Sequence, residues 1–205
     1  MFALVESGSI TKMLNGNQGI QIGDLKYPRA IYTLWTEAER NALGIYTIEY
    51  DDSNKKDEKW YINTDQSYAF ADNKVTASYG SATAKKHADT TWTQQQIDDG
   101  DAPAGADTDT VAVKGLKTVL IEQVKAQAEG ELNRTDWYIT RKAEKNTAIP
   151  SAITTHRDAV RTKQVAMETA ITNASDTPAL ETLYTYTRQE DGSTTRPLGE
   201  IPTLE

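Results

Sequence analysis

The sequence contains no cysteine and only two histidines, His87 and His156. The absence of cysteine excludes a disulfide framework, a thiolate nucleophile and a cysteine-ligated zinc site. Neither histidine has a second histidine or a close acidic partner at ligand spacing, so we expect no metal site. We expect no cofactor, and the fold must be stabilised by packing or by partners.

Long apolar runs are also missing. Hydrophobic residues make up 38% of the chain, and the mean hydropathy is −0.63. The longest apolar runs, such as Trp60–Ile62 and Val119–Ile121, span only a few residues and are too short to cross a membrane. The first six residues lack the pattern of a secretory signal. We expect a soluble chain with no membrane partner and an elongated or assembly-dependent shape.

Basic residues are too few to outnumber the acidic ones in either part of the chain. The formal net charge is −8, and residues 1–110 carry 17 acidic against 10 basic residues. Residues 111–205 are almost balanced, with 13 acidic and 12 basic residues. A protein that binds duplex nucleic acid needs a basic surface to displace counterions from phosphate. We therefore expect no nucleic acid partner.

Short extended segments and turns dominate the first part of the chain. Residues 1–35 alternate apolar stretches with glycine and asparagine, which is typical of strands joined by tight turns. Thr36, Glu39 and Gly44 predict a short helix with a capping box at its start and a left-handed exit. The period-two alternation of residues 45–80 then predicts an antiparallel meander.

Residues 98–110 read DDGDAPAGADTDT and contain no large apolar side chain. We interpret them as an acidic linker between a β-rich domain at residues 1–97 and a second domain at residues 111–205. A calcium site is the alternative, but the spacing does not match an EF-hand loop and no glutamate closes it. The aspartates concerned are Asp98, Asp99, Asp101, Asp107 and Asp109.

Beyond this segment the apolar period changes from two to about 3.6 residues. One amphipathic helix covers roughly residues 116–132, and a second follows Pro150, so an antiparallel helical hairpin is predicted. Asp176 and Pro178 mark the start of a third, short helix. Asp191-Gly192 between Thr- and Tyr-rich segments predicts a terminal β-hairpin. The predicted fold class is α+β, with an antiparallel β-rich N-terminal domain and this helical module.

Residue chemistry gives no catalytic site. No serine lies in a nucleophile-elbow context, and no glycine-rich stretch matches a phosphate-binding loop. Neighbouring carboxylates such as Asp51 with Asp52 lie among Ser, Asn and Lys, which favours solvated loop residues over tuned catalytic acids. We expect that the chain is not an enzyme.

Aromatic residues are the one candidate binding feature of the N-terminal domain. Trp60 and Tyr61, with other aromatic residues of the predicted strands, are compatible with a sugar-stacking face. Alternating Tyr and Trp on strands more often serve core and interface packing. A carbohydrate-binding module is therefore retained only as an alternative.

The most individual stretch of the chain is residues 129–151, EGELNRTDWYITRKAEKNTAIPS. It lies between the two predicted helices, and we interpret it as a structural clasp. Asp136 is expected to be hydrogen-bonded near a helix end, with Arg157 or Arg141 as its partner. Trp137 is expected to be mostly buried as a plug at the open end of the hairpin, and Pro150 to set up the second helix.

These residues carry a family resemblance. The order L-x-x-T-D-W-Y, R-K, I-P, spaced arginines, L-Y and a D-G hairpin resembles a C-terminal module of bacteriophage tail fibre and tail assembly proteins. The match covers roughly residues 114–200, and residues 27–46 resemble, more weakly, the start of small phage tail-region proteins. The matching residues are Leu132, Thr135, Asp136, Trp137, Tyr138, Arg141, Lys142, Ile149, Pro150, Arg157, Arg161, Leu183, Tyr184, Asp191 and Gly192.

The resemblance implies a structural protein of the phage tail, located in the virion and acting as a tail fibre adaptor or fibre-associated protein. Its partners would be other tail or fibre proteins and further copies of itself. The first alternative is a fibre assembly chaperone that is absent from the particle, and the second is a carbohydrate-binding receptor module of the tail.

Overall fold

The computed structural model describes residues 1–204, which form two compact units, Met1–Thr83 and a second unit that begins at Ala84. The boundary differs from the predicted one at residues 98–110. Those residues lie within the second unit, between helix α3 (Gln94–Asp98) and strand β11 (Val111–Val113). β11 pairs with β10 (Thr90–Thr91), so the acidic segment belongs to a loop that starts and ends in one small sheet.

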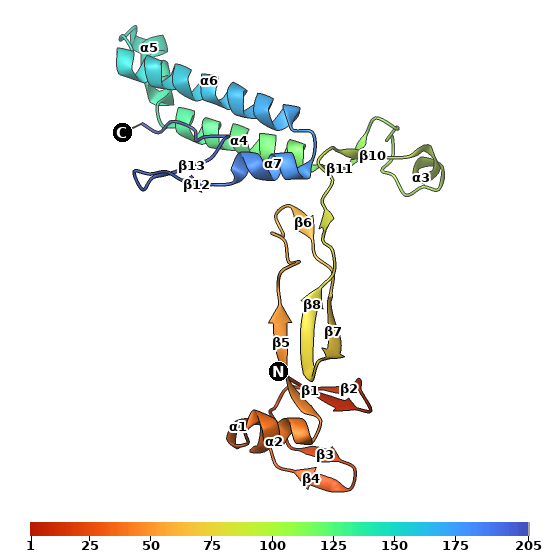
Figure 1. The fold of residues 1–205 in the computed structure, drawn as a ribbon. Coiled ribbons are helices and arrows are strands. Elements are labelled where there is room, and N and C mark those ends of the chain that lie inside the picture. Colours follow the sequence, from red (N-terminus) through yellow and green to blue (C-terminus); the bar gives the residue numbers. More distant parts are fainter. Residues whose placement is uncertain (205) are drawn as a thin grey trace. The chain divides into compact units, whose positions relative to one another are not determined.

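The first unit is built around a five-stranded sheet in the order β2-β1-β5-β8-β7 (Figure 1). The strands are β1 (Phe2–Glu6), β2 (Ser9–Leu14), β5 (Ile45–Asp51), β7 (Gln66–Ala71) and β8 (Lys74–Tyr79). β5 is long enough to pair with β1 through its first residues and with β8 through its last.

The α+β fold class is confirmed, but the predicted antiparallel meander over residues 45–80 is wrong in one respect. β5 and β8 run parallel, with Ile48 opposite Val75 and Tyr50 opposite Ala77. Parallel neighbours require a long connection, which residues 52–73 supply. Alternation identifies a strand and its buried face, but it does not identify which neighbour the strand pairs with.

Both faces of β1 are buried. Leu4 packs on one side with Ile31 and Ile45, whereas Ala3 and Val5 pack on the other side with residues of β5 and β8. The first side is covered by α1 (Ile31–Leu34) and by the hairpin of β3 (Ile20–Ile22) and β4 (Leu25–Tyr27). β1 therefore belongs to both cores of the unit.

The predicted capping box is present in α2 (Glu37–Ala42). The Thr36 hydroxyl accepts a hydrogen bond from the Glu39 backbone N–H, and the Glu39 carboxylate accepts one from the Thr36 N–H. Gly44 then has the left-handed φ of +77° that leads the chain into β5. A short strand β6 (Tyr61–Ile62) pairs with β9 (Thr83–Ala84) and completes this part of the fold.

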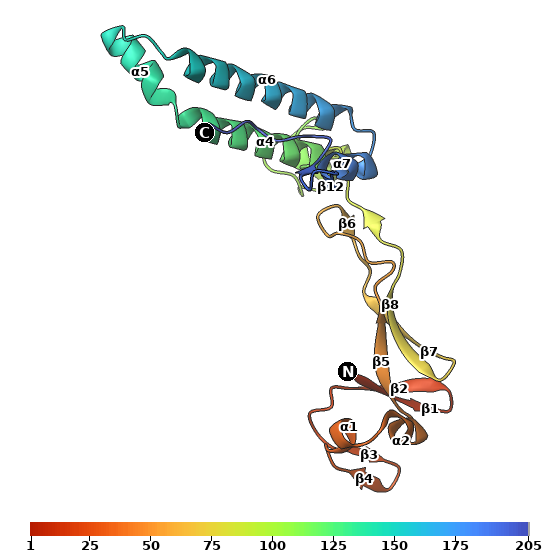
Figure 2. The same cartoon turned by 60° about the vertical axis from the view of Figure 1, so that its left-hand side comes forward.

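The second unit contains the predicted helical hairpin, made of α4 (Leu116–Asn133) and α6 (Ser151–Asn173) (Figures 1 and 2). α7 (Thr177–Tyr184) and the hairpin of β12 (Thr187–Arg188) and β13 (Thr194–Thr195) follow, as predicted. α5 (Asp136–Lys145) is an additional helix inside the stretch that was expected to be a joint. Apolar side chains from α4, α6 and α7 form the core, namely Leu120, Val124, Ala128, Ile153, Val160, Met167, Ile171 and Leu180.

α4 is capped from outside its own sequence. The Asp89 carboxylate accepts hydrogen bonds from the Gly115 backbone N–H at 2.7 Å and from the Thr118 hydroxyl at 2.9 Å, and these bonds lower the pKa of Asp89. A side chain at residue 115 would collide with the backbone of Ala88. Glycine at this position lets the segment before β10 lie against the helix start, where an anion is favourable.

Replacing Ile171, which is fully buried in α6, by alanine removes three buried carbon atoms and leaves a cavity. We expect the free energy of unfolding of the second unit to fall by about 2–5 kcal/mol. The matched control is Val165→Ala in the same helix, where the side chain is 63% exposed. Urea unfolding followed by circular dichroism measures both variants, and equal losses would contradict the assigned helix face.

Candidate functional site

Four residues of the resemblance, Leu132, Thr135, Asp136 and Arg157, meet where α4 ends and α5 begins. One nitrogen of Arg157, Nη1, lies 2.8 Å from the Leu132 carbonyl oxygen, 2.6 Å from the Thr135 hydroxyl and 2.8 Å from the Asp136 carboxylate. Thr135 is fully buried and also donates to the Leu132 carbonyl. The expected hydrogen bond of Asp136 near a helix end is confirmed, with Arg157 as its partner.

Arg157 links α6 to the end of α4 and to the start of α5. The carbonyl groups of the last turn of a helix have no partner within the helix. The Leu132 carbonyl accepts from the backbone N–H and the hydroxyl of Thr135, and a further, charged donor reaches it from another helix. α6 supplies that donor to Leu132 through Arg157, while Asp136 balances its charge on one side. The side chain of Arg157 is mostly buried, so this contact is shielded from water.

Glu131 forms a second polar centre one turn earlier on α4. One of its carboxylate oxygens lies 3.0 Å from His156 Nε2 and accepts a hydrogen bond of 2.7 Å from the Leu204 backbone N–H. Arg134 donates to both carboxylate oxygens. Glu131 is 8% exposed. We call the two centres together, Glu131, His156, Arg134, Thr135, Asp136 and Arg157, the polar clasp.

Burial by itself raises the pKa of Glu131, because it disfavours the charged form. The hydrogen bonds from Leu204, Arg134 and His156, together with the positive charge of Arg134, outweigh burial and lower the pKa below its ordinary value of 4.5. Glu131 is thus ionised at neutral pH and held by donors from three segments. Its oxygens are engaged in structure and not presented to a substrate.

Sequence reasoning missed Glu131, although a signal for it existed. The residue lies three positions after Ala128 and seven after Val124, which are buried on the inner stripe of α4. A charged residue on an apolar stripe is rarely buried without a partner. His156, placed by its spacing on the inner side of α6, is that partner.

The prediction for Trp137 is wrong. Its side chain is 51% exposed and does not plug the end of the hairpin. Asp136, as the first residue of α5, is held by Arg157, so the next position along the helix points outward. Trp137 packs instead on Tyr138, with ring centroids 3.8 Å apart, and on the Arg141 guanidinium, 4.7 Å from its ring.

The other two candidates in this region have separate positions. Pro150 is the N-cap residue of α6, and its carbonyl accepts hydrogen bonds from the backbone N–H groups of Ile153 and Thr154. Pro150 therefore sets up the second helix as expected. Arg161 lies one turn beyond Arg157, is exposed, and pairs only loosely with Asp158 at 3.5 Å. Arg161 is not part of the polar clasp.

Of the two aromatic candidates of the first unit, Trp60 has no open face. Trp60 is 3% exposed and has the Lys59 ammonium 4.5 Å from its ring. Tyr61 is half-buried. A sugar ring needs an open aromatic face, which Trp60 does not offer.

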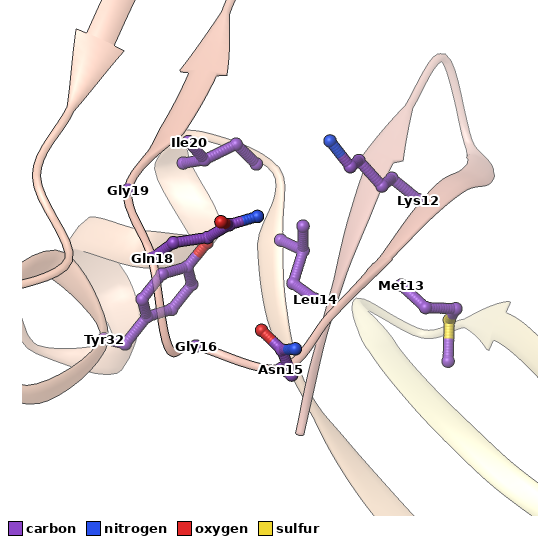
Figure 3. A pocket seen from close by; sticks show the side chains of 9 residues that line it. All are labelled: Lys12, Met13, Leu14, Asn15, Gly16, Gln18, Gly19, Ile20 and Tyr32. Atoms are coloured by element: carbon purple, nitrogen blue, oxygen red, sulfur yellow. The ribbon is translucent and has the colours of Figure 1, made fainter.

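A small cavity of about 110 Å³ lies between the end of β2 and the start of β3 (Figure 3). It is lined by glycine, asparagine and aliphatic groups, with Gln18 and Tyr32 on one side and Lys12 as its one charged side chain. No carboxylate, imidazole or thiol is among the lining residues. Within residues 1–204, no group of three potential metal ligands occurs.

Comparisons with family models, with curated proteins and with solved structures found no match to this chain. Among the described helices, none combines the length and the apolar character that crossing a membrane requires. The polar clasp is therefore the candidate functional site on the strength of its geometry alone.

Arg157→Met keeps an unbranched side chain, two atoms shorter, and removes the donor to Leu132 and Thr135. We expect a loss of about 1–3 kcal/mol in the free energy of unfolding, because the Leu132 carbonyl, the Thr135 hydroxyl and the Asp136 carboxylate lose a charged donor. Arg161→Met, one turn further along α6, is the matched control and should change stability by less than about 0.5 kcal/mol. Chemical denaturation measures the free energy of unfolding of both variants. Equal losses would contradict the stabilising role of Arg157 in the polar clasp.

The acid sensitivity of the second unit tests Glu131. Because its pKa is lower in the folded chain than the ordinary 4.5, ionised Glu131 stabilises the fold above about pH 4.5. This contribution is lost as the pH falls through the folded value. We expect the stability difference between the wild type and Glu131→Gln to be largest near neutral pH and to shrink below pH 4.5.

Urea unfolding at a series of pH values from about 7 to 3 measures this difference. Glu129→Gln, an exposed change two residues earlier in α4, controls at neutral pH for the loss of a charge. A wild-type advantage over Glu131→Gln that does not decline in acid would exclude an ionised Glu131 as the source of the stabilisation.

Proposed function

We propose that this chain is a structural protein of a bacteriophage tail that connects to or accompanies the tail fibres. The observation that carries the proposal is the polar clasp. Leu132, Thr135, Asp136 and Arg157, four residues of the resemblance to phage tail proteins, are joined by direct hydrogen bonds. A pattern whose members contact one another across two helices is a structural module and not an accident of composition.

The architecture is compatible with a role in assembly. β2 and β7 are the end strands in the order of the first unit's sheet and also approach each other, so other chains would pair only with the parts of these strands that this approach leaves open. The ionisable groups of the polar clasp take part in hydrogen bonds within the fold; the Glu131 carboxylate, for example, accepts from three residues. These features favour binding and scaffolding over chemistry.

Quantitative mass spectrometry of purified phage particles tests the proposal. We expect the chain in mature particles at a fixed ratio to the other tail proteins, and antibody labelling should place it on the tail. Its presence in the infected-cell lysate but absence from washed particles would contradict the virion role and favour a transient assembly chaperone. Particles of a phage that lacks the gene for this chain should have no fibres or should fail to form infectious tails.

A further inference from the structure

α5 is a helix without a core. None of its ten residues is buried, and Trp137 and Ile139 are 51% and 42% exposed. A helix this short is only marginally stable in water unless packing holds it. The contact of Asp136 with Arg157 anchors its first residue, and the rest of the helix is exposed or half-buried.

Three of these side chains form a built surface. The Arg141 guanidinium lies 4.7 Å from the ring centroid of Trp137 and 5.3 Å from that of Tyr138, and the two rings pack on each other. Arg141 Nε is shielded from solvent and has no hydrogen-bond partner. We call Trp137, Tyr138 and Arg141 the α5 face.

The α5 face lacks an anion. Among the described residues of the second unit, Arg134, Arg157, Arg161 and Arg196 each have a carboxylate within 4 Å, whereas Arg141 and Arg188 have none. Arg141 differs from Arg188 in that two aromatic rings lie against its guanidinium. The aromatic rings hold the guanidinium in one orientation and so preorganise it. Its planar N–H groups match the two oxygens of a carboxylate. The chemistry of the face therefore fits an exposed carboxylate.

The chain itself carries such a segment. The loop from Asp98 to Asp109 has five aspartates and no basic residue. All five of these aspartates are exposed. The residues between them are small or turn-forming, with Gly100 and Gly105 at positive φ. Asp98 and Asp99 are directed by hydrogen bonds from Gln94 and Gln95, so part of the acidic surface is already ordered.

The loop cannot reach the α5 face of its own chain in this fold. The segment before β10 is fixed at the start of α4 by hydrogen bonds from Gly115 to Asp89 and from Leu116 to the Lys86 carbonyl. α5 follows the other end of α4, which has 18 residues and spans about 27 Å. Figure 1 shows α3 and α5 beyond opposite ends of that helix.

We propose that the α5 face binds the acidic loop, residues 98–109, of a second copy of this chain. The contact joins two different surfaces, so it forms either a closed dimer, in which each copy's loop meets the other copy's α5 face, or a ring or row of copies. It rests on opposite charges at an exposed site and weakens as salt screens them. The proposal does not depend on the role in a phage tail.

Sedimentation velocity of the full chain tests the contact. The wild type should associate as its concentration rises, and raising the salt from about 0.05 to 0.5 M should reverse the association. Arg141→Glu should sediment as a monomer, and so should a triple variant Asp98→Lys, Asp99→Lys, Asp101→Lys. An equimolar mixture of the two should associate again, because the triple variant keeps a native α5 face and Arg141→Glu keeps a native loop.

Arg188→Glu, an exposed reversal on β12, is the control and should associate like the wild type. Circular dichroism checks that each variant is folded, which is expected because α5 contributes no buried residue. A wild type that stays monomeric, an Arg141→Glu variant that still associates, or a mixture that does not recover would each overturn the proposal.

A second measurement does not depend on charge-reversed chains. A labelled peptide of residues 97–110 should bind the full chain, and Arg141→Ala should weaken its affinity about tenfold or more through loss of a charge-assisted hydrogen bond. The same peptide with asparagine at every aspartate should not bind. Equal binding of both peptides, or of the peptide to wild type and Arg141→Ala, would contradict recognition of a carboxylate by this face.

Discussion

Two charged side chains, Glu131 and Arg157, are buried where the helices of the second unit meet, and both need partners to be tolerated there. Their partners come from every segment that arrives at this point. Glu131 binds α6 through His156 and the segment after β13 through Leu204. Arg157 binds the end of α4 and the start of α5. The connections around the hairpin follow from satisfying these two groups.

This constraint adds directional contacts to apolar packing. The inner stripes of α4 and α6 consist of Leu, Val, Ile, Met and Ala, and apolar stripes tolerate sliding more readily than hydrogen bonds do. A carboxylate that must meet His156 and a guanidinium that must meet the Leu132 carbonyl specify one register of the hairpin. The same contacts hold Asp136, and so direct the next residue, Trp137, toward solvent.

The sequence predicted best the features that depend on local chemistry. The capping box of Thr36 and Glu39, the helical hairpin and the pairing of Asp136 with Arg157 all follow from spacing and residue type. The parallel pairing of β5 with β8 was not predicted, because alternation along residues 45–51 is the same for either neighbour. The acidic segment at residues 98–110 has the composition of a linker, yet β10 and β11 on either side of it pair with each other.

Within the candidate site, the motif residues were correctly identified but two environments were not. Trp137 was expected inside because large aromatic side chains favour burial, and the anchoring of its neighbour places it outside. Glu131 was overlooked because its partners, His156 and Leu204, are 25 and 73 residues away in the sequence. The sequence indicates long-range hydrogen bonds of this kind only indirectly, through a charged residue on an otherwise apolar helix face.

The central claim is that the polar clasp closes the second unit, and the backbone amide of Leu204 reports on it directly. This amide lies outside every helix and strand and has the Glu131 carboxylate as its partner. Native-state hydrogen exchange measures its protection. We predict that the Leu204 amide exchanges as slowly as the core amides of α4, whereas the amide of Glu190, in the exposed turn between β12 and β13, exchanges fast. Rapid exchange at Leu204 would contradict the account.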